Sequence, residues 1–252
     1  MAVSRETSGV LLEMPRTRTP GLRFEVAAGN RMLLRQHDNI VLFARVLRNH
    51  FGVSVYRTSA YESPIPPIEA AMARRFTAEK PSSSAWLDRW AHRYAGWLVD
   101  AEDGPLHCGI WLLGQRDLPE YCLTTDLVAD FPAAHLDWMA QGWNGVLPLR
   151  KLPDRDAARV KAFRKQARDR VLPPLLLWSV SGLDGYLLLD GHHRLAAAKA
   201  EQIRPDVLLL ARHTASDQAA EPKARAWLHN GGAAAWEQNV QRAAPGWERR
   251  GE

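Results

Sequence analysis

The sequence predicts an α/β (α+β) protein, on three observations. Its hydrophobic content of 46% is that of a globular chain that buries a sizeable core. Between residues 145 and 213, short apolar runs typical of strands alternate with segments whose apolar residues recur at helical spacing. Upstream, both patterns occur in a less regular order. We therefore expect three parts: a less defined α+β region over 1–144, an α/β module over 145–213 and a helical tail over 214–252.

The elements of the first part follow from local patterns. Apolar residues at helical spacing predict one helix within 30–51 and a short one over 68–76. Pro81 to Ser84 favours a helix start, and four aromatic residues then share one face, which indicates packing in the core: Trp86, Trp90, Tyr94 and Trp97. Apolar runs at 96–100 and 107–113 flank turn residues at 101–105 and predict a hairpin.

The second part has sharper signals. Proline and glycine mark the ends of its elements, such as Pro173-Pro174 after a basic helix and Gly182 to Gly185 in a tight turn. The predicted order is a strand at 146–152, a helix from Pro153 and Asp154 to about 171, strands at 175–180 and 186–189, a helix from 191 to about 202 and a strand at 206–210.

The most informative segment runs from Leu188 to Ala198, where an apolar strand leads into Asp190, Gly191, His192, His193 and Arg194 and then into an alanine-rich helix. The start of a helix presents unpaired backbone N–H groups, which favour an anion such as phosphate. Gly191 lacks a Cβ that would keep a phosphate away, and Arg194 carries a fork of donors suited to phosphate oxygens. The motif therefore predicts a phosphate site.

Asp190 and the two histidines need separate interpretations. A carboxylate repels phosphate, so Asp190 either binds Mg²⁺ or takes part in proton transfer, or else is only the N-cap of the helix. Neighbouring helix residues point about 100° apart, which disfavours a shared metal ion between His192 and His193. One imidazole is expected to donate to a phosphate.

The segment from Tyr186 to Ala198, with a strand before it and a basic helix upstream, resembles the ParB/sulfiredoxin superfamily over roughly residues 145–212. That superfamily includes chromosome-partition CTPases, sulfiredoxins and free-serine kinases. The resemblance implies a mixed-sheet nucleotide-binding module in which Gly191, His192, His193 and Arg194 line the phosphate site. It does not extend to the N-terminal half.

Departures from each member narrow the choice. Sulfiredoxins have a catalytic Cys where this chain has His192, and the partition proteins have Gly-Glu-Arg-Arg at this turn and a helix-turn-helix downstream. The Asp-Gly-His-His-Arg string is most similar to the free-serine kinases, which place a catalytic Glu shortly after the first strand. Asp154 and Asp156 stand near that place here.

These observations give three functional hypotheses. The first is a phosphotransferase in which ATP or ADP (CTP as an alternative) binds with Mg²⁺ at Asp190, and Asp154, Asp156, Asp190 or His193 handles the proton of a small hydroxyl-bearing acceptor. The second is a nucleotide-gated regulator that contacts DNA through the basic segment 155–170. The third is an interaction protein without catalysis.

Composition indicates the charge and the cellular compartment expected under all three hypotheses. Net charge is +5, and residues 150–170 hold nine Lys or Arg against three Asp, so this segment dominates the basic character. Two cysteines, Cys108 and Cys122, exclude a disulfide scaffold. No apolar run approaches the ~18 residues of a membrane span. We expect a cytoplasmic protein without a membrane partner.

Overall fold

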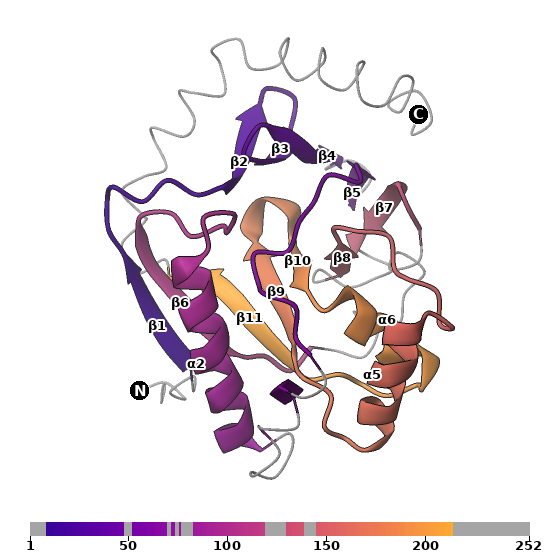
Figure 1. Ribbon diagram of the computed structural model, residues 1–252. Coiled ribbons are helices and arrows are strands. Elements are labelled where there is room, and N and C mark those ends of the chain that lie inside the picture. Colours follow the sequence, from indigo (N-terminus) through magenta and orange to yellow (C-terminus); the bar gives the residue numbers. More distant parts are fainter. Residues whose placement is uncertain are drawn as a thin grey trace, which may run out of the picture.

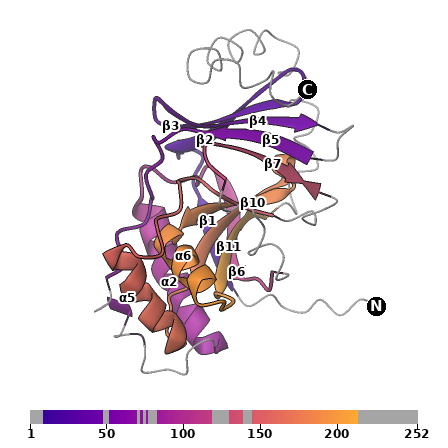
Figure 2. The same ribbon diagram turned by 90° about the vertical axis from the view of Figure 1, so that its right-hand side faces the viewer.

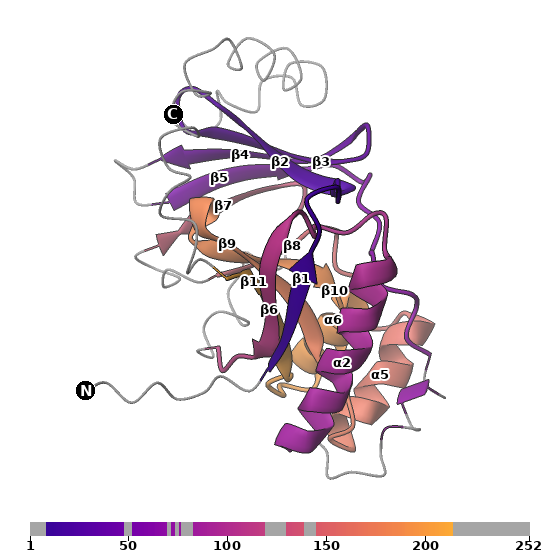
Figure 3. The same ribbon diagram turned by 90° about the vertical axis from the view of Figure 1, so that its left-hand side faces the viewer.

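The computed structural model describes residues 9–47, 52–69, 72–73, 76, 83–118, 130–138 and 145–213. These residues form an α+β structure with two sheets and three helices whose bounds are defined. A five-stranded sheet lies across one end of a six-stranded sheet, as the two side views show (Figures 2 and 3). The three helices lie around the six-stranded sheet (Figure 1).

The six-stranded sheet has the order β1-β6-β11-β9-β10-β8. Its strands are β1 Gly9–Met14, β6 Gly109–Gln115, β8 Val146–Pro148, β9 Leu175–Val180, β10 Gly185–Asp190 and β11 Val207–Arg212. β10 pairs with β8 in parallel and with β9 antiparallel, and β11 pairs with β9 in parallel and with β6 antiparallel. β1 and β6 precede residue 145, so the first part of the chain completes the sheet of the second.

The five-stranded sheet has the order β2-β3-β4-β5-β7 and is antiparallel throughout. Its strands are β2 Leu22–Ala27, β3 Arg31–Gln36, β4 Asn39–Leu47, β5 Gly52–Arg57 and β7 Ala133–Asp137. Gly29 and Asn30, both at positive φ, lie in the turn between β2 and β3, as expected of residues that tolerate this conformation.

Helix α2, Ser84–Asp100, packs along β1 and β6. Ser83 caps it by accepting a hydrogen bond from the Trp86 backbone N–H at 3.2 Å. Helices α5, Ala158–Arg168, and α6, His192–Ala200, pack against each other. Their contact consists of small and apolar residues, among them Val160, Phe163, Ala167 and Ala197. The alanines of α6 thus allow a close approach to α5.

One core cluster joins both sheets and α2. It contains Leu34 and Val55 from the five-stranded sheet, Leu176 and Leu189 from the six-stranded sheet and Trp90 from the helix. Strand residues that alternate with these, such as Leu175, Leu177 and Leu188, pack with Leu195 of α6 in a second cluster. Strands with both faces buried therefore position the start of α6.

Two sequence predictions for the first part are wrong. The helix predicted within 30–51 is replaced by β3 and β4, since Leu42 and Phe43 bury their side chains in two different clusters on the two faces of the sheet. The hairpin over 96–113 is also wrong, because residues 96–100 continue α2; only its second arm is a strand, β6. Of the short helix predicted over 68–76, Met72 and Ala73 are helical, and residues 70, 71, 74 and 75 lie outside the described residues, as does all of the tail after residue 213.

The predictions for 145–213 are largely confirmed. The strands at 175–180 and 206–210, the return strand and the two helices are present. The strand predicted at 146–152 is shorter, and α5 begins at Ala158 rather than at Pro153. The turn between β9 and β10 contains a 3-10 segment and Asp184 at positive φ. No helix in the described part of the chain is long and apolar enough to cross a membrane.

Candidate functional site

The end of β10 and the start of α6 form the centre of the candidate site. Gly191 is the N-cap of α6, has a φ of 109° and provides no side-chain cap. A Cβ at this position would lie 2.7 Å from a Leu175 methyl carbon. The glycine is thus required by its backbone conformation and by the packing of Leu175. Since Asp190 is not the N-cap, the capping interpretation of its side chain is wrong.

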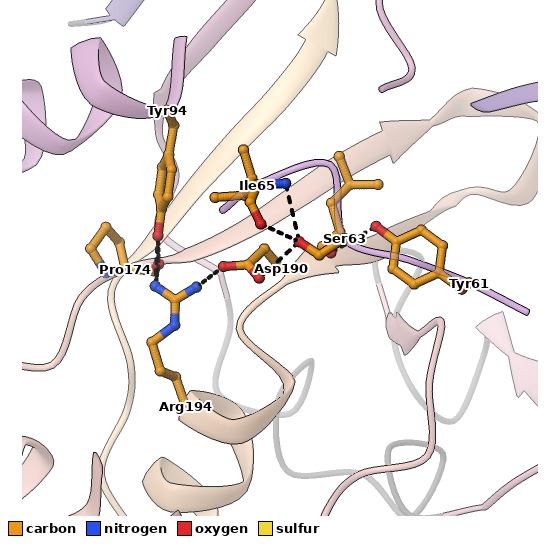
Figure 4. A network of polar contacts seen from close by, with 8 residues as sticks. Tyr61, Ser63, Ile65, Tyr94, Pro174, Asp190 and Arg194 are labelled. Atoms are coloured by element: carbon orange, nitrogen blue, oxygen red, sulfur yellow. Dashed lines mark hydrogen bonds and ion pairs between the residues drawn. The ribbon is translucent and has the colours of Figure 1, made fainter. Parts of the chain in front are cut away.

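Asp190 and Arg194 form an ion pair within a buried network (Figure 4). Arg194 is 2% exposed, and its Nη1 donates to the Tyr94 hydroxyl at 2.6 Å and to the Pro174 carbonyl at 2.7 Å. On its other side, Asp190 Oδ1 accepts a hydrogen bond from Ser63 Oγ at 3.0 Å. The guanidinium predicted to hold phosphate therefore binds protein groups and orients Asp190.

His192 is buried and acts as an acceptor. Its Nε2 accepts a hydrogen bond from the Arg150 backbone N–H at 3.1 Å. Burial, reinforced by the positive charge of Arg150, lowers the pKa of His192 well below its ordinary value. A neutral imidazole with Nε2 as acceptor ties the segment after β8 to the start of α6.

A cavity of about 190 Å³ opens at this point. Ser63, Ile65, Pro67 and Ile68 form one wall, and residues 190–194 form the base. The third wall comes from the segment after β8 and from α5, with Arg150, Lys151, Pro153, Arg159 and Phe163. Segments far apart in the sequence therefore meet around the motif that the sequence singled out.

The cavity has a cationic lining. Arg150, Lys151 and Arg159 contribute three positive charges, and Asp190 is the single carboxylate among the described residues that line it. Asp190 is already paired with Arg194. Burial, followed by the charges of Arg159 and Arg150, lowers the pKa of His193. The electrostatic field in the cavity therefore favours an anion.

Arg150 has the most specific environment of the three cations. Its guanidinium lies over the Tyr61 ring, 5.6 Å from the ring centre. Its Nε is buried and has no hydrogen-bond partner among the described residues. Buried donors are normally satisfied, so this unpartnered Nε is an exception among the described residues.

The two aspartates predicted as catalytic bases lie elsewhere. Asp154 and Asp156 are described and exposed, and neither lines the cavity. Asp156 forms an exposed ion pair with Lys161 at 3.8 Å. Of the predicted site residues, the structure brings together Asp190, Gly191, His192, His193 and Arg194.

Part of the basic segment 155–170 is used within the protein. Arg164 and Arg168 both donate to Glu201 Oε1, at 2.5 and 2.8 Å. These hydrogen bonds lower the pKa of Glu201. Arg159 lines the cavity. DNA binding by this segment stays a prediction. Arg164 and Arg168 are paired with Glu201, so fewer basic side chains are available to contact DNA phosphates than the sequence suggests.

Sequence reasoning missed Ser63, and it assigned Arg150 and Arg159 only to a general basic segment. Ser63 lies 127 residues before Asp190 in a proline-rich connection without a motif. The signal for Arg150 was its place near the carboxyl end of a predicted strand of the same module, where ligand-binding side chains of α/β proteins often lie.

The residues present fit Mg²⁺ in one way only. Among the described residues no group of three or more His, Cys, Asp or Glu side chains gathers to hold a metal. Mg²⁺ commonly binds one or two carboxylates together with phosphate oxygens and water. Asp190 is therefore the side chain that fits such an ion when it accompanies a phosphate ligand.

A comparison of the chain with models of protein families, with curated proteins and with solved structures found no match.

Proposed function

We propose that this protein binds a nucleotide by its phosphate groups in the cavity at Asp190 and transfers a phosphoryl group from it. The observation that carries this proposal is the cationic lining. Arg150, Lys151 and Arg159 lie around the start of α6, and the Asp190 carboxylate, which also lines the cavity, is paired within the protein. Phosphoryl transfer needs mainly positioning and neutralisation of charge, which such a lining supplies.

The parts of the cavity have distinct roles in this proposal. The first N–H groups of α6 and the guanidinium of Arg150 hold the phosphates. Arg159 and Lys151 neutralise further charge. Phe163 and Ile68 provide an apolar wall for the ribose or the base. Asp190, which already accepts a hydrogen bond from a hydroxyl, is the proton acceptor.

This assignment revises the sequence hypothesis in two respects. Of the four residues predicted to handle the proton, Asp190 is kept as the acceptor, and Asp154, Asp156 and His193 are not. The phosphate-binding arginines are Arg150 and Arg159 in place of Arg194. ATP or ADP, with CTP as the alternative, remains the proposed nucleotide. Mg²⁺ remains the proposed metal, and in this proposal the phosphate oxygens would hold it, because Asp190 serves as the proton acceptor. The fold relationship to the ParB/sulfiredoxin superfamily remains part of the proposal, supported by the strand–turn–helix placement of Asp190 to Arg194.

Calorimetry with ATP, ADP, CTP and GTP in the presence of Mg²⁺ tests the binding step. Loss of one charged hydrogen bond costs about 1.5–3 kcal/mol, so Arg150→Ala should weaken binding by roughly tenfold or more. Arg159→Ala should weaken it in the same direction. Arg155→Ala is the matched control, because Arg155 is exposed, carries the same charge and does not line the cavity.

Each outcome has a clear meaning. Equal weakening by Arg155→Ala and Arg150→Ala would reduce the effect to bulk charge and contradict the assigned cavity. Absence of binding to all four nucleotides would reject the proposed function. Tight binding of CTP without phosphoryl transfer would favour a nucleotide-gated regulator over a transferase.

A further inference from the structure

The Ser63 hydroxyl is held against the carboxylate that the proposed function uses as proton acceptor. Ser63 Oγ lies 3.0 Å from Asp190 Oδ1 and accepts a hydrogen bond from the Ile65 backbone N–H at 3.2 Å. The Ile65 carbonyl lies 3.3 Å from the same Oγ. Ser63 is half-buried and forms part of the cavity wall. A hydroxyl within hydrogen-bond reach of a carboxylate is the arrangement of a nucleophile and its base.

A third group orients this base. Asp190 Oδ2 pairs with Arg194, which is fixed in turn by the Tyr94 hydroxyl and the Pro174 carbonyl (Figure 4). The segment that carries Ser63 is fixed as well, since the Tyr61 hydroxyl donates to the Leu189 carbonyl at 2.7 Å. Ser63, Asp190 and Arg194 therefore contact one another in sequence, as nucleophile, base and orienting cation. Buried hydrogen bonds fix the segment of Ser63 at one end and Arg194 at the other.

The lining of the cavity indicates what the hydroxyl attacks. Arg150, Lys151 and Arg159 share the cavity with Ser63. A cationic cavity favours an electrophile that carries negative charge, such as a phosphoryl group, over a neutral acyl group. Ser63 therefore faces the space that the proposed function assigns to the nucleotide phosphates.

We propose that Ser63 is the nucleophile of a two-step transfer and carries the phosphoryl group as a phosphoserine. This inference rests on the proposed function. In the first step Ser63 Oγ bonds to the terminal phosphorus of the nucleoside triphosphate, and the hydroxyl proton passes to Asp190. The bond between that phosphorus and the bridging oxygen breaks, and the nucleoside diphosphate leaves.

In the second step an acceptor hydroxyl, from a small molecule or water, bonds to the phosphorus. The bond from phosphorus to Ser63 Oγ breaks, Asp190 returns its proton to Oγ and the acceptor proton passes to solvent. The enzyme is regenerated, and no oxidant or further reactant is required.

The experiment incubates the full chain with Mg²⁺ and ATP, and separately CTP, without an acceptor. Mass spectrometry of the intact chain and of its peptides should find one phosphoryl group, located on Ser63. Transfer of label from ADP into ATP should also occur, since formation of a phosphoserine is reversible. Ser63→Ala should abolish both signals, and Asp190→Asn should slow them about 10²-fold or more.

Ser54→Ala is the control, because Ser54 bonds His135 and does not line the cavity; both signals should persist in it. Nucleotide binding by Ser63→Ala, measured by calorimetry, separates the two proposals. If this variant binds nucleotide and still transfers phosphate to water, transfer is direct and the phosphoserine inference is wrong, while the proposed function stands. If the wild type binds no nucleotide, both are wrong.

Discussion

Side chains of the Asp190 motif have different tasks from those that their chemistry first suggests. A guanidinium in a motif of this kind suggests phosphate binding, yet Arg194 is 2% exposed and has three partners within the protein. A fully desolvated cation needs such partners, since an unpaired one would be very costly. The protein meets this need with Asp190, Tyr94 and Pro174, so the guanidinium groups of Arg150 and Arg159 are the ones that can interact with a ligand in the cavity they line.

The neutral state of His192 gives a prediction for pH. Its pKa is lowered in the folded protein, so the unfolded chain binds the proton more readily, and stability is lost as pH falls below the unfolded pKa of ~6.5. Between pH 7.5 and 5.5 this loss should be about 1 kcal/mol. Urea denaturation at both pH values should show a smaller loss for His192→Gln, which keeps an acceptor for the Arg150 N–H. An equal loss in both proteins would contradict the assignment.

Tyr94→Phe tests the network around Arg194. The substitution removes the Tyr94 hydroxyl. This hydroxyl accepts a hydrogen bond from Arg194 Nη1 at 2.6 Å and donates one to the Pro174 carbonyl at 2.7 Å. A bond to a charged group contributes about 1.5–3 kcal/mol, so the free energy of unfolding should fall by roughly 2 kcal/mol. Tyr56→Phe, on a half-buried side chain outside the network, is the control in the same denaturation series. A change below that of the control would show that the hydroxyl is replaceable by water.

At the residue scale, the sequence indicated which residues gather at the cavity better than the direction in which their side chains point. The motif from Asp190 to Arg194 does line a cavity. Arg194 instead donates to Tyr94, which lies on another helix, and to Pro174, which lies in a loop. These two partners decide that its guanidinium is engaged within the protein. Partners so distant in the sequence leave no local pattern, so the direction of the guanidinium could not be predicted.

Among the elements, α2 follows its sequence signals closely. Ser83 is the N-cap, and Trp86, Trp90 and Tyr94 are buried on one face. Ser83→Ala removes the acceptor for the Trp86 N–H and should lower the free energy of unfolding by about 1 kcal/mol. Ser84→Ala, one position inside the helix and exposed, should change it little. Equal effects of the two substitutions in urea denaturation would show that the cap is dispensable.

The strands of the five-stranded sheet were misread for a physical reason. Amphipathic strands alternate polar and apolar residues, but β4 buries Leu42 in one cluster and Phe43 in another. Burial on both faces removes the alternation, and a continuous apolar run also matches helical spacing. The Gly29-Asn30 pair was the available signal for a hairpin.

For the molecule as a whole, Arg57 links the two sheets. It is 1% exposed, extends from the end of β5 and donates to the Pro148 carbonyl of β8 at 2.9 Å, as well as to Pro132 and Asp130 carbonyls. Burial lowers its pKa to about 10. A lysine lacks the fork that reaches several carbonyls, so Arg57→Lys should destabilise the protein by about 3 kcal/mol.

The measurement for Arg57→Lys is urea denaturation followed by both tryptophan fluorescence and circular dichroism. Because one core cluster joins the sheets, the two probes should give one coincident transition, shifted to lower urea. Arg35→Lys, at a half-buried arginine whose Nε lies 2.9 Å from Glu25 Oε1, should shift it less. Two separate transitions in the wild type would show that the sheets unfold independently.

The sequence also predicted the second half of the chain better than the assembly of the two halves. Local turns and helix signals define β9, β10 and α6, but nothing local indicates that β1 and β6 join their sheet. The same holds for the cavity, whose wall at Ser63 to Ile68 belongs to the connection after β5. Long-range pairing of this kind depends on the energy of the whole core.

The position of β11 determines when this protein can fold during its synthesis. This strand comes last among those described, yet it lies between β6 and β9. Until residue 212 has left the ribosome, both neighbours present open edges, which are templates for pairing with other chains. A nascent chain halted before residue 207 would therefore expose the unpaired edges of both β6 and β9 and depend on chaperones. A chain released after residue 213 can insert β11 between them and complete the sheet.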